Sequence, residues 1–205
     1  MICLWCYLSY VIVDEICYVR QNKGGLGVGW RPSHTEVVYR LLDHERERSG
    51  RYYRDFITEL LFNFGGGFGR ADLVIIEYGR IIGGVKGKAL ILYEVKTEEK
   101  GLPSVIFDAC RQVELYKIGL SNPEVFVDDE NNIEKLKDAL YFCAYLVIRE
   151  DLWGKMAGQP KKTRKKLSTL MNICGLGLIT YDKNWNFQYS KEHLAYRFTL
   201  KGNKR

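Results

Sequence analysis

Three charged side chains, Asp72, Glu94 and Lys96, lie at the ends of two apolar segments. Glu94 and Lys96 close the run ALILYEVKT, and Asp72 comes directly before the run LVII. Carboxylate oxygens are ligands that Mg²⁺ prefers, and a lysine beside them can orient or deprotonate water and offset charge that develops on a phosphate. If the two segments are neighbouring strands, the three side chains predict a divalent cation site.

The segment 89–97 has the composition of a strand that is covered on both faces. Side chains alternate along a strand, so Glu94 and Lys96 leave the same face, roughly 6–7 Å apart at ~3.3 Å of rise per residue. A half-buried charge there costs several kcal/mol unless a partner or a metal compensates it. A simple ion pair at the strand end is the alternative explanation, and for an isolated Glu-x-Lys it is the commoner one.

The elements that position these side chains follow from the pattern of apolar residues. A helix is predicted from Ser33, because apolar residues recur at helical spacing over 37–42, and Ser33 with Glu36 forms the capping-box pattern. The remaining chain predicts strands over 50–64, 70–78, 89–97, 141–149, 175–182 and 186–190, and helices over 104–120, 132–140 and, after a loop, within 159–175. The Gly-rich segment 79–88 predicts a hairpin that would bring Asp72 within reach of Glu94.

This order predicts an α/β fold with a mixed central sheet flanked by helices. Residues 31–205 would form that domain, and residues 1–30 would form a strand-rich extension that serves dimerisation or docking. The uncharged N-terminal run is about 13 residues long, shorter than the ~20 needed to span a bilayer, so no membrane contact is expected.

Composition adds a hint about partners. The formal charge of +6 and pI of about 8.9 suit a polyanionic partner, and basic residues cluster at 161–166 and 201–205, although both could be solvated loop or tail segments.

The six cysteines lack metal-ligand spacing beyond the pair Cys3 and Cys6, which predicts a cytoplasmic protein with reduced, structural thiols. The scarcity of Gln against plentiful Lys, Arg, Glu, Ile and Tyr favours a hot-environment source.

At this point the sequence resembles the PD-(D/E)XK nuclease superfamily. The residues that carry the resemblance are Asp72 in GRADLVII and Glu94-Val95-Lys96 in LYEVKT, with Ala71 where the family usually has proline. The resemblance implies a restriction-endonuclease-like core of order α-β-β-β-α-β. Two further motifs resemble RecB-type exonucleases: QVELY, Gln112–Tyr116, and the G-x-x-D of 69–72. The late segment 175–182 is similar to a strand of archaeal Holliday-junction resolvases.

The resemblance implies a Mg²⁺- or Mn²⁺-dependent deoxyribonuclease that hydrolyses phosphodiester bonds. Asp72, Glu94 and the Val95 carbonyl would hold the metal. Lys96 would activate water or stabilise the phosphate, and Gln112 would position the lysine or the nucleophile. A residue of the first helix would join the site, either Glu36 or His34, and we favour Glu36.

The implied partner is DNA, in repair, recombination or mobile-element processing, with the protein acting as a homodimer or within a larger nuclease complex. The residues expected to contact DNA are Arg70, Arg111, Tyr116, Lys161, Lys162 and Arg164. Two other functions stay open: a catalytically inactive nuclease-fold protein for nucleic-acid binding or assembly, and a structural α/β domain with surface ion pairs.

Overall fold

The computed structural model describes residues 30–48, 50, 52–63, 68–82, 84–97, 101–122, 125–190 and 198–199 of the 205-residue chain. The chain divides into two units, Met1–Arg31 and Pro32–Arg205, and the fold below is that of the second unit. The strands expected within residues 1–20 and the basic segment 201–205 lie outside the described residues.

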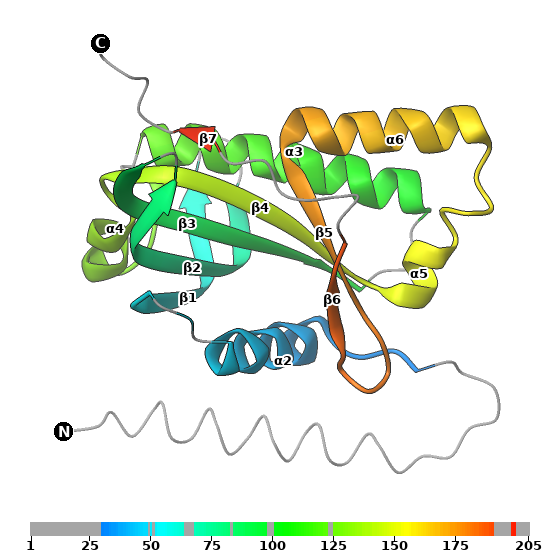
Figure 1. Cartoon of the computed structure of the whole chain (residues 1–205), viewed down its shortest axis with the longest axis horizontal. Helices are drawn as coiled ribbons and strands as arrows, with labels where there is room; N and C mark the ends of the chain where they lie inside the picture. The colour runs from blue at the N-terminus through cyan, green and yellow to red at the C-terminus, as the bar shows by residue number, and fades with distance from the viewer. Residues whose placement is uncertain are drawn as a thin grey trace. The chain divides into compact units, whose positions relative to one another are not determined.

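A mixed sheet forms the centre of this unit (Figure 1). Within the described residues its order is β1-β2-β3-β4-β5-β6, and a short seventh strand, β7, pairs with β4. The strands are β1 (Arg54–Asn63), β2 (Phe68–Ile82), β3 (Val85–Lys96), β4 (Ala139–Arg149), β5 (Leu176–Tyr181), β6 (Phe187–Tyr189) and β7 (Phe198–Thr199). Pairs β1–β2, β2–β3, β5–β6 and β4–β7 are antiparallel, whereas β3–β4 and β4–β5 are parallel. The carboxyl ends of β3, β4 and β5 therefore meet at one edge of the sheet.

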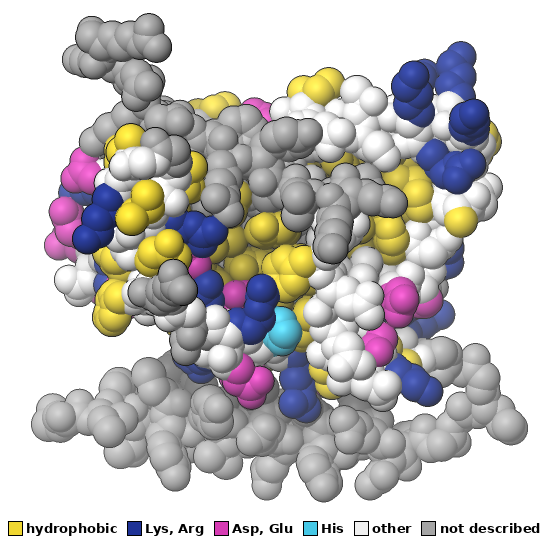
Figure 2. Space-filling model, in the orientation of Figure 1, with side chains coloured by type: hydrophobic (Ala, Val, Ile, Leu, Met, Phe, Trp, Pro, Cys, Tyr) yellow, Lys and Arg dark blue, Asp and Glu magenta, His cyan; other side chains and the backbone are white. Residues whose placement is uncertain are grey.

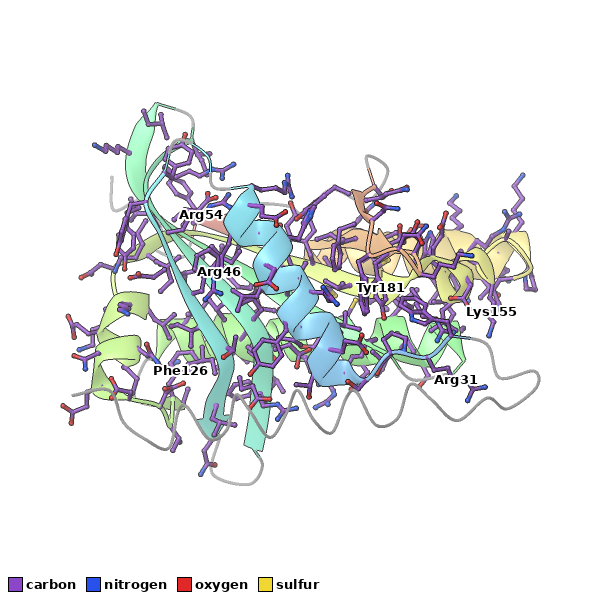
Figure 3. The ribbon with its side chains drawn as sticks, turned by 90° about the horizontal axis from the view of Figure 1, so that it is seen from below. Arg31, Arg46, Arg54, Phe126, Lys155 and Tyr181 are labelled. Carbon is purple, nitrogen blue, oxygen red and sulfur yellow. The ribbon has the colours of Figure 1, made fainter. Side chains whose placement is uncertain are left out.

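Helices cover both faces of the sheet. The helices are α2 (His34–Glu47), α3 (Leu102–Ser121), α4 (Glu130–Leu136), α5 (Glu150–Gly154) and α6 (Lys161–Cys174). Figure 1 shows α3 and α6 on one face and α2 on the other. From below, α2 crosses the sheet obliquely and ends near Arg54 (Figure 3).

Two apolar layers follow from the alternation of side chains along the strands. On the α3 face, Val74, Ile76, Leu90 and Leu92 pack with the buried stripe of α3. On the α2 face, the intervening strand residues pack with the stripe Val37, Val38, Leu41 and Leu42. The prediction of an α/β fold with a mixed sheet flanked by helices is confirmed, as is the burial of β3 on both faces.

The predicted helix boundary at Ser33 is also confirmed, since its hydroxyl oxygen accepts a hydrogen bond from the Glu36 N–H at 3.1 Å. Sequence pattern alone does not predict α5 or β7, which have only five and two residues. None of the described helices combines the length and the apolar character that crossing a bilayer requires.

Candidate metal centre

The pairing of β2 with β3 brings the two predicted carboxylates together. Leu73 is the partner of Tyr93, and continuing this antiparallel register by one residue places Asp72 opposite Glu94. Both side chains lie on the α3 face, and directly opposed residues have Cβ atoms about 4.5–5.5 Å apart. The two carboxylates are therefore neighbours at the end of the paired region.

Asp72 is 4% exposed and is held from two sides. The Val95 backbone N–H donates to Asp72 Oδ2 at 2.7 Å, and His34 Nε2 lies 3.1 Å from Oδ1. The hydrogen bond to Asp72 raises the pKa of His34, although burial of the ring opposes this. Since the N–H and C=O of one strand residue point to the same neighbouring strand, the Val95 carbonyl also faces β2.

Glu94 is 2% exposed and receives three donors. Lys96 Nζ lies 2.8 Å from Oε1, and the Tyr116 hydroxyl donates to Oε2 at 3.1 Å. The Gln112 amide, assigned with its nitrogen toward Glu94, donates to Oε2 at 2.8 Å and also reaches Oε1. This agrees with the predicted position of Gln112 near the site.

Glu94 nevertheless remains short of compensation. Burial, followed by the negative charge of Asp72, raises the pKa of Glu94 to about 7, and the contacts from Lys96 and Tyr116 only partly offset this. A buried carboxylate with this pKa gains from any cation that approaches it. We call Asp72, Glu94 and Lys96 the acidic cluster.

Lys96 bridges two carboxylates, which sequence reasoning did not foresee. Its Nζ lies 2.8 Å from Glu94 Oε1 and 2.8 Å from Asp108 Oδ2. Burial alone would lower the pKa of Lys96, but Glu94 and Asp108 outweigh it and the pKa is raised. The ammonium group is therefore held at the site as a charged group.

Asp108 belongs to a stripe of α3 that faces the acidic cluster. Asp108, Gln112 and Tyr116 are spaced four residues apart, which places them on one face of a helix. The same spacing in the sequence could have identified Asp108, because the Q-x-x-x-Y motif extends backward by one step of four.

The structure assigns Tyr116 a different position from the predicted DNA contact. Tyr116 is only 1% exposed, and its hydroxyl donates to the Arg70 carbonyl at 2.6 Å as well as to Glu94. Its ring meets Phe62 edge to face, with centroids 4.9 Å apart. Tyr116 therefore holds Glu94 from inside the core.

Gly69, the first residue of the G-x-x-D motif, supports the same packing. A Cβ at position 69 would lie 1.9 Å from Phe62 Cζ, inside any real contact distance. The Phe62 ring is fixed between Tyr116 and Phe126, so it has little room to retreat. The glycine thus lets the ring support Tyr116.

On α2 it is His34 that lies against Asp72, whereas we favoured Glu36, whose part in the site stays a prediction. His34 touches Asp72, whereas in the described part of the chain Glu36 has no side-chain contact with Asp72 or Glu94. The reason is the phase of the helix: His34 lies four residues before the buried Val38, and Glu36 lies four residues before the exposed Arg40.

The donor set fits a hard divalent cation. Among the described residues no group of three or more His, Cys, Asp and Glu side chains forms a complete metal cage. Mg²⁺ commonly takes only one or two carboxylates and keeps several waters. Two buried carboxylates and the Val95 carbonyl match that requirement, and the raised pKa of Glu94 gives the reason why a cation would be favoured there.

The predicted phosphate-contacting residues are exposed. Arg111 Nη2 lies 3.0 Å from Asp108 Oδ1, which connects it to Lys96 through one carboxylate. Arg70, which precedes Asp72 of the acidic cluster by two residues in the sequence, pairs with Glu59 at 3.2 Å. Lys161, Lys162 and Arg164 are exposed in the first turns of α6, where Figure 2 shows basic side chains gathered.

Comparison with models of known protein families, with curated proteins and with solved structures finds no match. The chemistry of the site therefore rests on its own residues, and the resemblance to PD-(D/E)XK nucleases stays a prediction carried by the acidic cluster.

Proposed function

We propose that this protein is a Mg²⁺-dependent deoxyribonuclease, built on a restriction-endonuclease-like core, that hydrolyses phosphodiester bonds; Mn²⁺ would serve in place of Mg²⁺. The observation that carries the proposal is the pair of opposed, buried carboxylates with Lys96 Nζ 2.8 Å from Glu94. A structural ion pair with Lys96 would need only one of the two carboxylates. A surface that only binds phosphate would carry neither of them.

In this proposal Asp72, Glu94 and the Val95 carbonyl hold the metal, and His34 orients Asp72. When bound, the metal supplies Lewis-acid polarisation of the phosphate and lowers the pKa of a water molecule. Gln112 and Tyr116 fix the Glu94 carboxylate in one orientation.

Lys96 supplies the positive charge that the reaction needs beside the metal ligands. Its two carboxylate partners keep Nζ fixed and protonated, so it is suited to stabilise the charge that develops on the phosphate oxygens. A fixed donor costs no reorganisation at the moment of reaction.

DNA is the proposed substrate because basic residues flank an acidic centre. Arg70 and Arg111 would contact phosphates near the site, and Lys161, Lys162 and Arg164 of α6 would contact phosphates farther along the strand. We place the protein in cytoplasmic DNA repair, recombination or mobile-element processing, as a homodimer or as part of a larger nuclease complex.

The test is a cleavage assay on labelled linear, branched and single-stranded DNA with Mg²⁺ or Mn²⁺. We expect cleavage by the wild type and a loss of about a hundred- to a thousandfold in Asp72→Asn and Lys96→Met. The controls are Asp43→Asn and Lys137→Met, which change exposed residues of i,i+3 ion pairs. Wild-type protein that binds DNA in a salt-dependent way but cleaves none of the substrates would instead indicate an inactive nuclease-fold binding or assembly protein.

A further inference from the structure

Two of the three described cysteines meet on the α3 face of the sheet. Cys110 lies in the first half of α3, and Cys174 is the last residue of α6. Both belong to the apolar layer under these helices, where they are 3% and 6% exposed. Neither residue takes part in the proposed reaction.

The packing of α3 against α6 brings these distant positions of the chain together. The two helices lie on the same face of the sheet and contact each other (Figure 1). Lys117, two turns after Cys110 on α3, donates from Nζ to the Cys174 carbonyl at 2.8 Å. The end of α6 is therefore held against the part of α3 that carries Cys110.

The two side chains are in direct contact. The Cys110 thiol donates a hydrogen bond to the Cys174 sulfur. A disulfide forms only between cysteines whose side chains face each other across a short gap. Hydrogen-bonded thiols on two packed helices face each other in this way.

Packing alone is the alternative explanation, because a buried cysteine behaves as a small apolar side chain. Packing requires neither residue to be a cysteine, since other small apolar side chains fill such positions. A covalent bond requires both. The two explanations therefore differ in whether an oxidant joins the two sulfurs.

The surroundings of the pair determine which oxidant can act on it. Burial, followed by the hydrogen bond to Cys174, raises the pKa of the Cys110 thiol, and the charge of Lys117 opposes this only in part. Cys110 is therefore a protonated thiol at neutral pH and stays reduced without an oxidant. Both residues are buried, so a small, uncharged oxidant such as hydrogen peroxide suits the site better than a bulky disulfide.

We propose that Cys110 and Cys174 form a modification site at which a peroxide creates a disulfide between α3 and α6. In the first step one thiol becomes a sulfenic acid, as the O–O bond of hydrogen peroxide breaks and one water molecule leaves. The other sulfur then attacks the sulfenic sulfur, the S–S bond forms, and a second water molecule leaves. The two thiols together lose two electrons, the peroxide gains them, and both thiol hydrogens leave in the water.

The disulfide would link two helices that are far apart in the sequence. It closes a long loop, from Cys110 to Cys174, and so restricts the unfolded chain, which should raise the melting temperature by about 10 °C. It would also fix α3, the helix that carries Asp108, Gln112 and Tyr116. The bond itself does not depend on the proposed nuclease activity.

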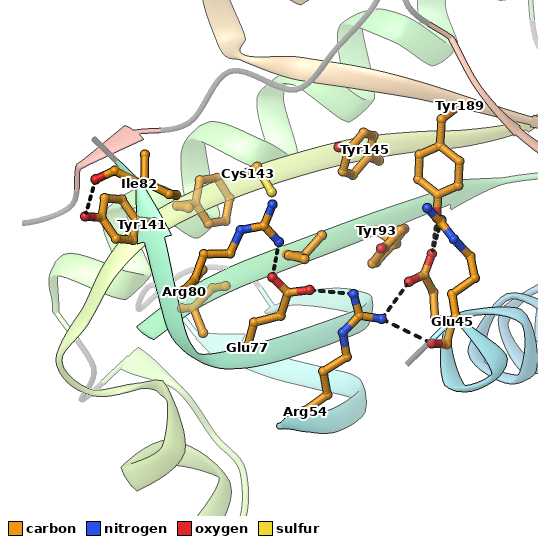
Figure 4. A pocket seen from close by; sticks show the side chains of 15 residues that line it. Glu45, Arg54, Glu77, Arg80, Ile82, Tyr93, Tyr141, Cys143, Tyr145 and Tyr189 are labelled. Carbon is orange, nitrogen blue, oxygen red and sulfur yellow. Dashed lines mark hydrogen bonds and ion pairs between the residues drawn. The ribbon is translucent and has the colours of Figure 1, made fainter. Parts of the chain in front are cut away.

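The test is peptide mapping of the folded full chain after treatment with hydrogen peroxide and alkylation of the remaining thiols. We expect a linked pair of peptides that contain Cys110 and Cys174, two hydrogens lighter than their sum and separated again by dithiothreitol. Cys143→Ala is the matched control, because Cys143 lies on the other face of the sheet, where it lines a cavity with Arg80 and Tyr145 (Figure 4). This variant should form the same link.

A second measurement connects the link to the contact between the two thiols. Cys174→Ala should lose both the linked peptides and the rise in melting temperature on oxidation, whereas Cys143→Ala should keep both. Treatment in concentrated urea should remove the preference for this pair among the six cysteines. The proposal would be overturned if peroxide leaves Cys110 and Cys174 unlinked in the folded wild type, if Cys174→Ala shows the same rise in melting temperature, or if urea leaves the preference unchanged.

Discussion

The acidic cluster lies on β2 and β3. The arginine cluster consists of Glu45 and Arg48 at the end of α2, Arg54 of β1, and Glu77 and Arg80 of β2. The two clusters share β2, yet they compensate buried charge in opposite ways. In the arginine cluster each glutamate has two guanidinium partners, and the sum of charges is positive. In the acidic cluster one lysine stands against two carboxylates and pairs with Glu94, and the pKa of Glu94 rises to about 7. The first arrangement is compensated by the protein itself, whereas the second calls for a cation from outside.

Neutralising one glutamate in each cluster distinguishes the two arrangements most strongly. Glu77→Gln leaves Arg54 and Arg80 buried without their carboxylate, which should lower the free energy of unfolding by about 3–5 kcal/mol. Glu94→Gln removes a carboxylate that is poorly compensated, so in metal-free buffer at pH 8 it should raise the free energy of unfolding. Urea denaturation of both variants measures the two signs, and loss of stability of the same size in both would contradict the comparison.

The pH dependence of the free energy of unfolding, again measured in metal-free buffer, also distinguishes the acidic cluster from the arginine cluster. The pKa of Glu94 is about 7 in the folded protein against an ordinary value of 4.5, so between these values the folded state binds more protons than the unfolded state. Stability should therefore fall as pH rises from 4.5 to 7, by about 3 kcal/mol from this group.

Glu94→Gln isolates the contribution of this residue. The difference between wild type and variant should grow through that pH window and stay constant above it. A difference that is the same at pH 4.5 and pH 8 would show that Glu94 is already compensated by Lys96.

A packing substitution tests how the core supports the acidic cluster. Gly69→Ala forces Phe62 toward Tyr116 and should cost about 1–3 kcal/mol of stability, with a loss of cleavage because Tyr116 holds Glu94. Gly101→Ala is the matched control, since its Cβ would meet open space. Equal melting temperatures for the two variants would show that the Phe62 ring retreats freely.

The smallest effect is expected from Asp108→Asn. Asp108 is partly exposed, so losing its pair with Lys96 should change stability by less than about 1 kcal/mol. Cleavage should fall by about tenfold because Lys96 loses one of its two anchors, and Asp108→Glu should restore part of it. Glu114→Gln, which removes an exposed pair with Lys117, should leave cleavage unchanged.

Much of this architecture could be predicted because it depends on local pattern. Strand alternation placed Glu94 and Lys96 on one face, and the hairpin between β2 and β3 placed Asp72 opposite Glu94. What depends on tertiary packing was harder to predict. His34, and not Glu36, lies against Asp72 because of the way the apolar stripe of α2 packs on the sheet. The signal in the sequence was the spacing of His34 from Val38.

The arginine cluster was missed for a similar reason. Glu77 interrupts the apolar run of β2, and Glu45 falls on the buried stripe of α2, so both were visible as misplaced charges in the sequence. Arg48 and Arg80 follow Glu45 and Glu77 by three residues. Arg54, which joins the two glutamates, comes from β1, and local pattern does not pair it with either of them.

The central claim, that Asp72 and Glu94 together bind a divalent cation, is tested most directly by titrating Mn²⁺ into the wild-type protein and into Asp72→Asn at pH 8. We predict saturable binding by the wild type, with a rise in melting temperature, and neither effect in the variant, which should remain folded. The same Mn²⁺ affinity in both proteins, or no saturable binding by the wild type, would contradict the account.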